Sequence, residues 1–264
     1  LFRHRVGAPM TDPYAVAATS PSGITAPTVD QFRELANDRR VIPVVRRFLV
    51  DDQTPVGLYA KLAAGRPGTF LLESAENGQT WSRYSFIGVR SAAMLTEHEG
   101  QVLWVGNAPA DLPDRGLAVE ALRDTLSSLR TPRPHGLPPL TGGLVGFIGY
   151  DAVRRWERLP DANPDDLHLP ELAMLLATDL AVMDHVDGSI WLVANAVNYD
   201  NTDAGVDRAF QDAVARLDVM QADLHAASPA KVQAIVPATT SQASANHDYR
   251  AAVEVAKEYI RAGD

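Results

Sequence analysis

Turn dipeptides between short strand-like segments constrain the fold of this chain more than any other sequence feature. They stand at 77–78 (Asn-Gly), 99–100 (Glu-Gly) and 187–188 (Asp-Gly), each between two such segments. Asn-Gly and Asp-Gly favour the tight turns of β-hairpins, so the strands on either side are expected to run antiparallel. Because helical patterns lie between these hairpins, we expect the α+β class, with antiparallel sheets and helices packed on them.

Cap residues and apolar spacing predict the helices. Thr28 and Thr54 each precede a helical pattern and are candidate N-caps. Apolar residues at helical spacing also cover 117–129, 203–224 and 249–260. The helices therefore separate the strands along the chain.

Composition divides the chain into four parts. Residues 1–27 are rich in Ala, Thr, Pro and Ser, and we expect a flexible leader there. Residues 28–225 are expected to form one domain, 226–245 a linker, and 246–264 a single further helix. That last helix has an apolar face with nothing after it to pack on, so we expect the polypeptide to continue in nature.

Charge and composition exclude several classes of function. The net charge is −9, which disfavours nucleic acid as a partner, since phosphate binding needs a surplus of Lys and Arg. There is no cysteine, so disulfides, cysteine-based metal sites and thiol nucleophiles are excluded. No apolar run approaches the roughly 20 residues of a membrane helix. We expect a soluble, cytoplasmic protein with no membrane partner.

Catalytic motifs are not found in this sequence. The seven histidines have no paired ligand spacing, and we expect neither a metal site nor catalytic residues in this segment. The glycine-rich segment at 142–149 lacks the Lys and Ser/Thr of a phosphate loop. We interpret it as a strand in which glycine permits close approach of another backbone.

The densest polar and aromatic stretch offers the best candidate binding site. Glu73 could pair with an ammonium group, Ser74 could hydrogen-bond a carboxylate or an amine, and Arg83 could bind a carboxylate. Together these groups would suit a free amino acid. The alternative is an internal Glu73–Arg83 salt bridge, with Trp81 and Tyr84 in the core.

Several long segments resemble a known family. These are LLES at 71–74, WSRYSFIG at 81–88, GGLVGFIGYD at 142–151 and LPELAMLLATDLAVMDH at 169–185. In their order and spacing they resemble the large subunit, component I, of anthranilate synthase. The resemblance covers about residues 28–264. It implies a four-layer α/β/β/α sandwich, of which this chain would be a truncated part.

The resemblance also implies a function. Members of this family convert chorismate, with ammonia from glutamine, to anthranilate and pyruvate in tryptophan biosynthesis, and they use Mg²⁺. Their LLES segment belongs to an allosteric pocket for tryptophan, which carries over to Glu73 and Ser74, with Arg83 and Tyr84 as supports. A glutamine amidotransferase small subunit is the expected partner.

This chain is accordingly expected to be the amino-terminal, tryptophan-binding regulatory portion. The helix at 246–264 would then be the first of the chorismate-binding domain. With the catalytic half absent, this segment would bind no Mg²⁺ and would show no turnover alone. Two alternatives remain open: the corresponding part of aminodeoxychorismate synthase component I, and a non-catalytic ligand-binding module of the same fold.

Overall fold

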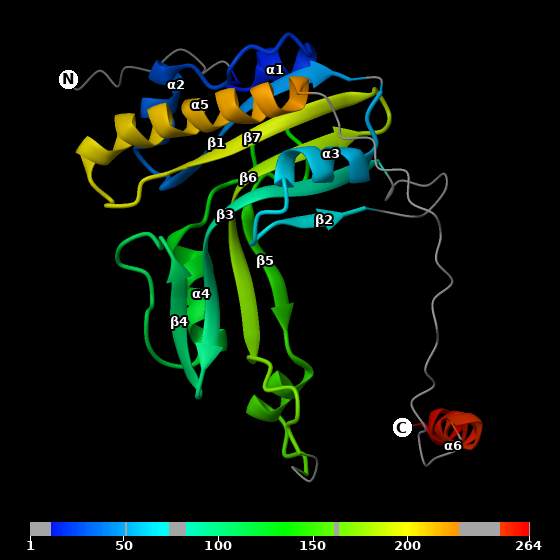
Figure 1. Cartoon of the computed structure of the whole chain (residues 1–264). Coiled ribbons are helices and arrows are strands. Elements are labelled where there is room, and N and C mark those ends of the chain that lie inside the picture. Colours follow the sequence, from blue (N-terminus) through cyan, green and yellow to red (C-terminus); the bar gives the residue numbers. More distant parts are fainter. Residues whose placement is uncertain (1–11, 51, 74–82, 161–163, 227–248, 264) are drawn as a thin grey trace, which may run out of the picture. The chain divides into compact units, whose positions relative to one another are not determined.

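The structure describes the chain from residue 12 onward, and these first residues belong to a folded unit. The computed structural model describes residues 12–50, 52–73, 83–160, 164–226 and 249–263 (Figure 1). The chain divides into two compact units, Leu1–Ser228 and Pro229–Asp264. All the described strands lie in the first unit, and the second unit holds helix α6 (Tyr249–Ala262).

One antiparallel sheet forms the centre of the first unit. Its strands follow the order β1-β7-β6-β3-β2, with β4 paired to β3 and β5 paired to β6. The strands are β1 (Val41–Leu49), β2 (Phe70–Leu72), β3 (Tyr84–His98), β4 (Gln101–Gly106), β5 (Gly143–Ile148), β6 (Leu172–Asp184) and β7 (Ser189–Val197). Every pairing is antiparallel, which confirms the expected α+β class. The described residues form one sheet, and the four-layer sandwich stays an expectation.

Strand β3 is longer than the sequence indicates. Residues 81–87 and 92–97 each have the sequence pattern of a separate strand, but from Tyr84 onward they form one strand that pairs with β6 along its length. Register shifts between Gly88 and Ala93 interrupt the ladder, and such bulges bend a strand locally. Strands β1, β2 and β7 attach at one end of the β3–β6 pair, and β4 and β5 at the other (Figure 1).

The main core lies between the sheet and helix α5 (Asp203–His225), which runs along β7 and β1 (Figure 1). Leu217 of α5 is completely buried against this face. Helix α2 (Val29–Leu35) packs beside α5, where the rings of Phe32 and Phe210 lie 5.0 Å apart. A smaller cluster at the other end of the sheet joins helix α4 (Ala118–Ser128) to β3 and β4.

The expected flexible leader is wrong for residues 12–27. Helix α1 (Ala15–Thr19) packs against β1, and the ring of Tyr14 is 1% exposed, with its hydroxyl donating to the carbonyl of Pro43 at 2.9 Å. Ala26 pairs with Val45 through an isolated bridge. Alanine and tyrosine side chains can be buried even in a segment rich in Pro and Ser. The composition of this segment therefore did not predict its packing against β1. Residues 1–11 lie outside the described residues.

The predicted caps are confirmed. Thr28 accepts from the backbone N–H of Gln31, whose side chain accepts in turn from the N–H of Thr28, which makes a capping box. Thr54 accepts from Gly57 and begins helix α3 (Pro55–Ala63). Each cap satisfies an N–H that the helix leaves unpaired.

The glycine-rich segment behaves as predicted. Gly146 lies in β5 opposite Met174, and a Cβ added there would lie 1.8 Å from the carbonyl oxygen of Ala173. No side chain fits in this space, so glycine is required for the close approach of β5 to β6. The segment that follows β5 forms a short 3₁₀ helix, η2 (Tyr150–Arg155).

Helix α6 forms over Tyr249–Ala262, which covers the helix predicted at 249–260. Most of the linker expected at 226–245 lies outside the described residues. In the described part of the chain, no helix combines the length and apolar character needed to cross a membrane.

A buried ion pair joins the sheet to α5. Asp179 of β6 is 2% exposed, and its carboxylate accepts from the guanidinium of Arg216. Arg216 also donates to the carbonyl of Asn195 at 2.7 Å and to Asp212 at 2.8 Å. Arg90 approaches Asp179 from the neighbouring strand at 3.8 Å. Burial raises the pKa of Asp179, while the charges of Arg216 and Arg90 oppose that rise.

We predict that Arg216→Met lowers the free energy of unfolding by about 3–5 kcal/mol at neutral pH, because it leaves Asp179 buried without its closest cation. The pKa of Asp179 should rise further in this variant. A carboxyl with a raised folded-state pKa contributes stability that is present at low pH and lost as pH rises through that pKa. The defect should therefore shrink as the pH falls, as measured by urea unfolding at several pH values.

The matched control is Arg208→Met on the same helix. Its side chain is 72% exposed and pairs with Asp200 at 3.3 Å, so we expect a change below about 1 kcal/mol. Equal losses for the two variants, or a defect in Arg216→Met that is independent of pH, would contradict the structural role of the Asp179–Arg216 pair.

Candidate functional site

The predicted site residues meet where β2, β3 and β6 end together. Strand β2 ends at Leu72, opposite Phe86 of β3. Glu73 therefore follows β2 at the same end of the sheet at which Tyr84 begins β3. Tyr84 in turn lies opposite Asp184, the last residue of β6. We call this region the amino-acid corner and define it by Glu73, Arg83, Tyr84 and Asp184.

Asp184 holds Arg83 in place. Its carboxylate is 2% exposed and accepts from Nε of Arg83 at 3.0 Å and from Nη2 at 2.7 Å. It also accepts from the backbone N–H of Val186 at 3.1 Å. The hydrogen bond to Asp184 raises the pKa of Arg83 further above its usual range. The guanidinium is thus fixed and charged, while its Nη1 group has no acceptor among the described residues.

Two aromatic rings lie beside this cation. The guanidinium of Arg83 stands 4.9 Å from the ring centroid of Tyr84, a cation–π contact. The ring of Tyr84 lies 6.0 Å from that of Phe86, tilted by 38°. Burial, followed by the charge of Asp184, raises the pKa of Tyr84, so its phenol stays protonated at neutral pH.

A second polar contact supports the start of β3. The hydroxyl of Ser85, 1% exposed, lies 2.8 Å from Nε2 of His185. The backbone N–H of His185 donates to the carbonyl of Arg83 at 2.8 Å. These bonds fix the backbone on which Arg83 and Tyr84 stand.

Glu73 is exposed and forms no hydrogen bond or ion pair with any other described residue. The internal Glu73–Arg83 salt bridge that we considered as an alternative is therefore not formed, because Arg83 pairs with Asp184 instead. Ser74 and Trp81 lie outside the described residues. The structure thus brings Glu73, Arg83 and Tyr84 to one end of the sheet and leaves Ser74 as a prediction.

Sequence reasoning missed Asp184 and His185 as members of this corner. They stand just before the Asp-Gly turn at 187–188, and no motif in the sequence marks them as site residues. The signal that could have found them is the antiparallel pairing of β3 with β6, which places the start of one strand beside the end of the other.

Within the described ranges, no three His, Asp or Glu side chains come together in a way that could hold a metal ion. The part of the chain that the structure describes therefore offers no cluster that fits Mg²⁺.

Comparison with known proteins gives consistent matches. The sequence model of a family described as chorismate binding enzyme matches residues 68–264. The chain is 49% identical over 248 residues to anthranilate synthase component 1 of Arthrobacter globiformis, covering 92% of this chain and 47% of that relative. It is 51% identical over 245 residues to the protein of the same name from Mycobacterium tuberculosis H37Rv, covering 89% of this chain and 46% of that one. The chain thus spans about half the length of these relatives.

A solved structure, anthranilate synthase component I from Streptococcus pneumoniae, aligns with a TM-score of 0.39 and 18% identity, over 65% of this chain and 36% of that chain.

The family match corrects one expectation. We expected only an amino-terminal regulatory portion that lacks the catalytic half. The match to chorismate binding enzymes covers 68–264, which includes most of the region assigned to regulation. The expectation is therefore wrong: the chain contains sequence of the chorismate-binding domain and is not restricted to regulation.

We predict that Arg83→Ala lowers the free energy of unfolding by about 1–2 kcal/mol, because it leaves the buried carboxylate of Asp184 with one backbone donor. This expected loss of stability is small for a buried carboxylate, because the side chain of Arg83 is 46% exposed and water partly screens its charge. Chemical denaturation measures the change. Arg115→Ala is the control, since that side chain is 89% exposed and pairs with Asp114 at 3.6 Å. A similar loss in both variants would argue against a fixed Arg83.

Proposed function

Because this chain belongs to the family of chorismate binding enzymes and is a homologue of anthranilate synthase component 1, we propose that it acts in the conversion of chorismate to anthranilate. The observation that carries the proposal is the alignment over 248 residues at 49% identity to a protein of that name. The reaction belongs to the whole enzyme. The designation component 1 implies a second component, and a glutamine amidotransferase small subunit that supplies ammonia suits that role.

We further propose that the amino-acid corner binds free tryptophan as a feedback inhibitor. The support is a pair of unused, opposite charges at one end of the β2–β3 hairpin. The carboxylate of Glu73 has no partner among the described residues, and neither does Nη1 of Arg83. A zwitterionic ligand offers an ammonium group to the first and a carboxylate to the second.

The remaining groups suit the rest of such a ligand. The Tyr84 and Phe86 rings supply an apolar, aromatic surface beside the cation, against which an indole ring could stack. Ser74 follows Glu73 directly in the sequence and would add a hydroxyl close to the ammonium or carboxylate of the ligand. Asp184 does not contact the ligand in this proposal; it positions Arg83.

Inhibition would follow from differential affinity. A ligand shifts a protein toward the arrangement that it binds more tightly, by the difference between its binding free energies for the two states. Tryptophan at this corner would lower activity if it bound better to an arrangement that is poor in chorismate turnover.

We predict that Glu73→Gln weakens tryptophan binding to the intact natural protein about tenfold, since a charge-assisted hydrogen bond to the ammonium group is lost. Titration calorimetry measures the dissociation constant. Indole-3-propionate, which lacks the ammonium group, should bind both proteins equally. Glu99→Gln changes an exposed carboxylate in the β3–β4 turn and should have no effect. An unchanged tryptophan affinity in Glu73→Gln would remove Glu73 from the site.

We also predict the product of the reaction. The intact natural protein supplied with chorismate, ammonia and Mg²⁺ should release anthranilate and pyruvate, which fluorescence and a coupled pyruvate assay detect. Formation of an aminodeoxychorismate product without pyruvate would assign the protein to the folate branch instead. This assay is independent of the tryptophan measurement, because the reaction can be established whether or not the amino-acid corner binds an inhibitor.

A further inference from the structure

Helix α4 carries a buried hydroxyl group that has no partner. Thr125 is completely buried, and its Oγ1 forms no hydrogen bond with any described residue. A Ser or Thr hydroxyl inside a helix commonly donates to the carbonyl one turn earlier, as Ser127 of α4 does to Arg123 at 3.0 Å. A buried hydroxyl without a partner lowers stability. The position of Thr125 therefore calls for a group that the described residues do not supply.

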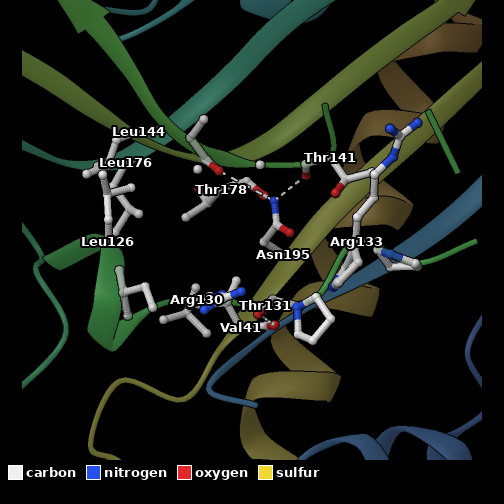
Figure 2. A pocket seen from close by; sticks show the side chains of 18 of the residues that line it. Val41, Leu126, Arg130, Thr131, Arg133, Thr141, Leu144, Leu176, Thr178 and Asn195 are labelled. Carbon is white, nitrogen blue, oxygen red and sulfur yellow. Dashed lines mark hydrogen bonds between the residues drawn. The ribbon is translucent and has the colours of Figure 1, made fainter. Parts of the chain in front are cut away.

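This hydroxyl lines a cavity of about 470 Å³ between α4 and the sheet (Figure 2). Residues of β1, β6 and β7 line one side of the cavity, and the end of α4 with the segment 129–144 lines the other. The volume falls within the range of about 300–1,000 Å³ that is usual for small-molecule sites. None of the four residues that define the amino-acid corner lines this cavity.

The walls of the cavity are largely apolar. Figure 2 shows Leu126, Leu144 and Leu176 on one side, with Asn195 across from them. Such walls favour a ligand with an apolar body, because its burial removes apolar surface from water.

The charged groups of the lining are exposed and do not converge. Arg130 and Arg133 are the charged residues among those that line the cavity, and both are exposed. Figure 2 shows them on opposite sides of Asn195. Water therefore solvates each guanidinium group, and the two form no common site for one anion. Because an unpaired charge is costly to bury, we expect the ligand of this cavity to be uncharged.

Asn195 provides a second unused polar group in these walls. Its Nδ2 donates to the carbonyl oxygens of Thr141 at 2.8 Å, Thr178 at 3.3 Å and Ala177 at 3.4 Å. Three acceptors around one end of the amide assign the nitrogen to that end. Oδ1 accepts no hydrogen bond from any described residue, although Asn195 is only 3% exposed.

Gly142 permits this arrangement. A Cβ at that position would lie 2.4 Å from Nδ2 of Asn195, so only glycine lets the backbone at 141–143 approach closely enough for Thr141 to accept from the amide. Oδ1 of Asn195 is therefore held in a defined orientation, and it can receive a hydrogen bond from an O–H group of a ligand.

We propose that this cavity binds an uncharged ring compound that carries hydroxyl groups. Its ring lies against the leucine walls, one of its O–H groups donates to Oδ1 of Asn195, and Oγ1 of Thr125 donates to another of its oxygens. The inference rests on the cavity alone and holds whether or not the proposed reaction and the tryptophan site are correct.

The test uses 2,7-dihydroxynaphthalene as the probe, with the intact natural protein and ligand-observed saturation-transfer NMR. We expect saturable binding. Thr125→Val keeps the shape of the side chain and removes only the unpartnered hydroxyl, so the variant should be at least as stable as the parent in urea unfolding. It should bind the probe about fivefold to tenfold more weakly, because one hydrogen bond to the ligand is lost. The matched control is Ser127→Ala, which removes a hydroxyl of α4 outside the cavity and should bind as the parent does.

Matched ligands separate the contributions. The compound 2,7-dimethoxynaphthalene keeps the ring and both oxygens but has no donor for Asn195, so it should bind several-fold more weakly than the probe. The compound 7-hydroxy-2-naphthoate replaces one hydroxyl by a carboxylate and should also bind more weakly, because its charge would be buried without a partner.

Two further variants test the place of binding and the absence of a charge contact. Leu126→Trp, at a half-exposed position of the cavity wall, should abolish binding by occupying the space. Its control is Arg123→Trp, an exposed position of α4 outside the cavity, which should bind normally. Arg130→Gln/Arg133→Gln should bind the probe as the parent does, because neither guanidinium contacts it.

Four results would overturn the proposal. The first is the absence of saturable probe binding by the parent, which would leave the cavity to water. The second is equal affinity in the parent and in Thr125→Val. The third is tighter binding of the naphthoate than of the probe, or a tenfold loss in the double arginine variant, either of which would make the site anionic in preference. The fourth is displacement of the probe by tryptophan, which would place it at the amino-acid corner.

Discussion

The pairing of β3 with β6 is the constraint on which the rest of the first unit depends. These two long strands are the only described ones that run through both ends of the sheet, and every other strand, apart from β1, is hydrogen-bonded to one of them. Bulges between Gly88 and Ala93 bend β3 midway along this pair. The corner with Arg83 and the small core beside α4 therefore lie at opposite ends of one strand pair, on either side of these bulges.

Strand β6 also carries the two carboxylates that organise its surroundings. Asp179 and Asp184 are both 2% exposed, and each is joined to an arginine from a distant part of the chain. Because side chains alternate along a strand, these two residues, an odd number of positions apart, point to opposite faces. On one face, the Asp179–Arg216 ion pair joins β6 to α5. On the other, the Asp184–Arg83 ion pair joins β6 to the residue before β3. Buried charges are costly unless paired, so each pair specifies which segments must meet.

Local features of the fold could be predicted from the sequence, and long-range ones could not. The caps at Thr28 and Thr54, the hairpin across 187–188 and the glycine-dependent approach of β5 each depend on a few neighbouring residues. The partner of Arg83 is Asp184, a residue far along the chain that becomes a neighbour only through strand pairing. The same reason explains why the cavity around Asn195 had no sequence signal, since its lining comes from β1, α4, β5, β6 and β7. Composition misjudged residues 12–27, because burial there depends on single side chains such as Tyr14.

The place of β1 in the sheet has a consequence for biosynthesis. Among the strands of the described residues, β1 pairs only with β7, from Val41 opposite Val197 to Leu49 opposite Ser189. On the ribosome, β1 emerges before β7, whose residues are translated between 140 (Leu49 to Ser189) and 156 (Val41 to Val197) positions after their partners. Contacts between such remote segments form slowly, since a long loop must close first. The nascent chain therefore carries an apolar strand with an unpaired edge until β7 has left the exit tunnel. During that interval it is a natural substrate for chaperones.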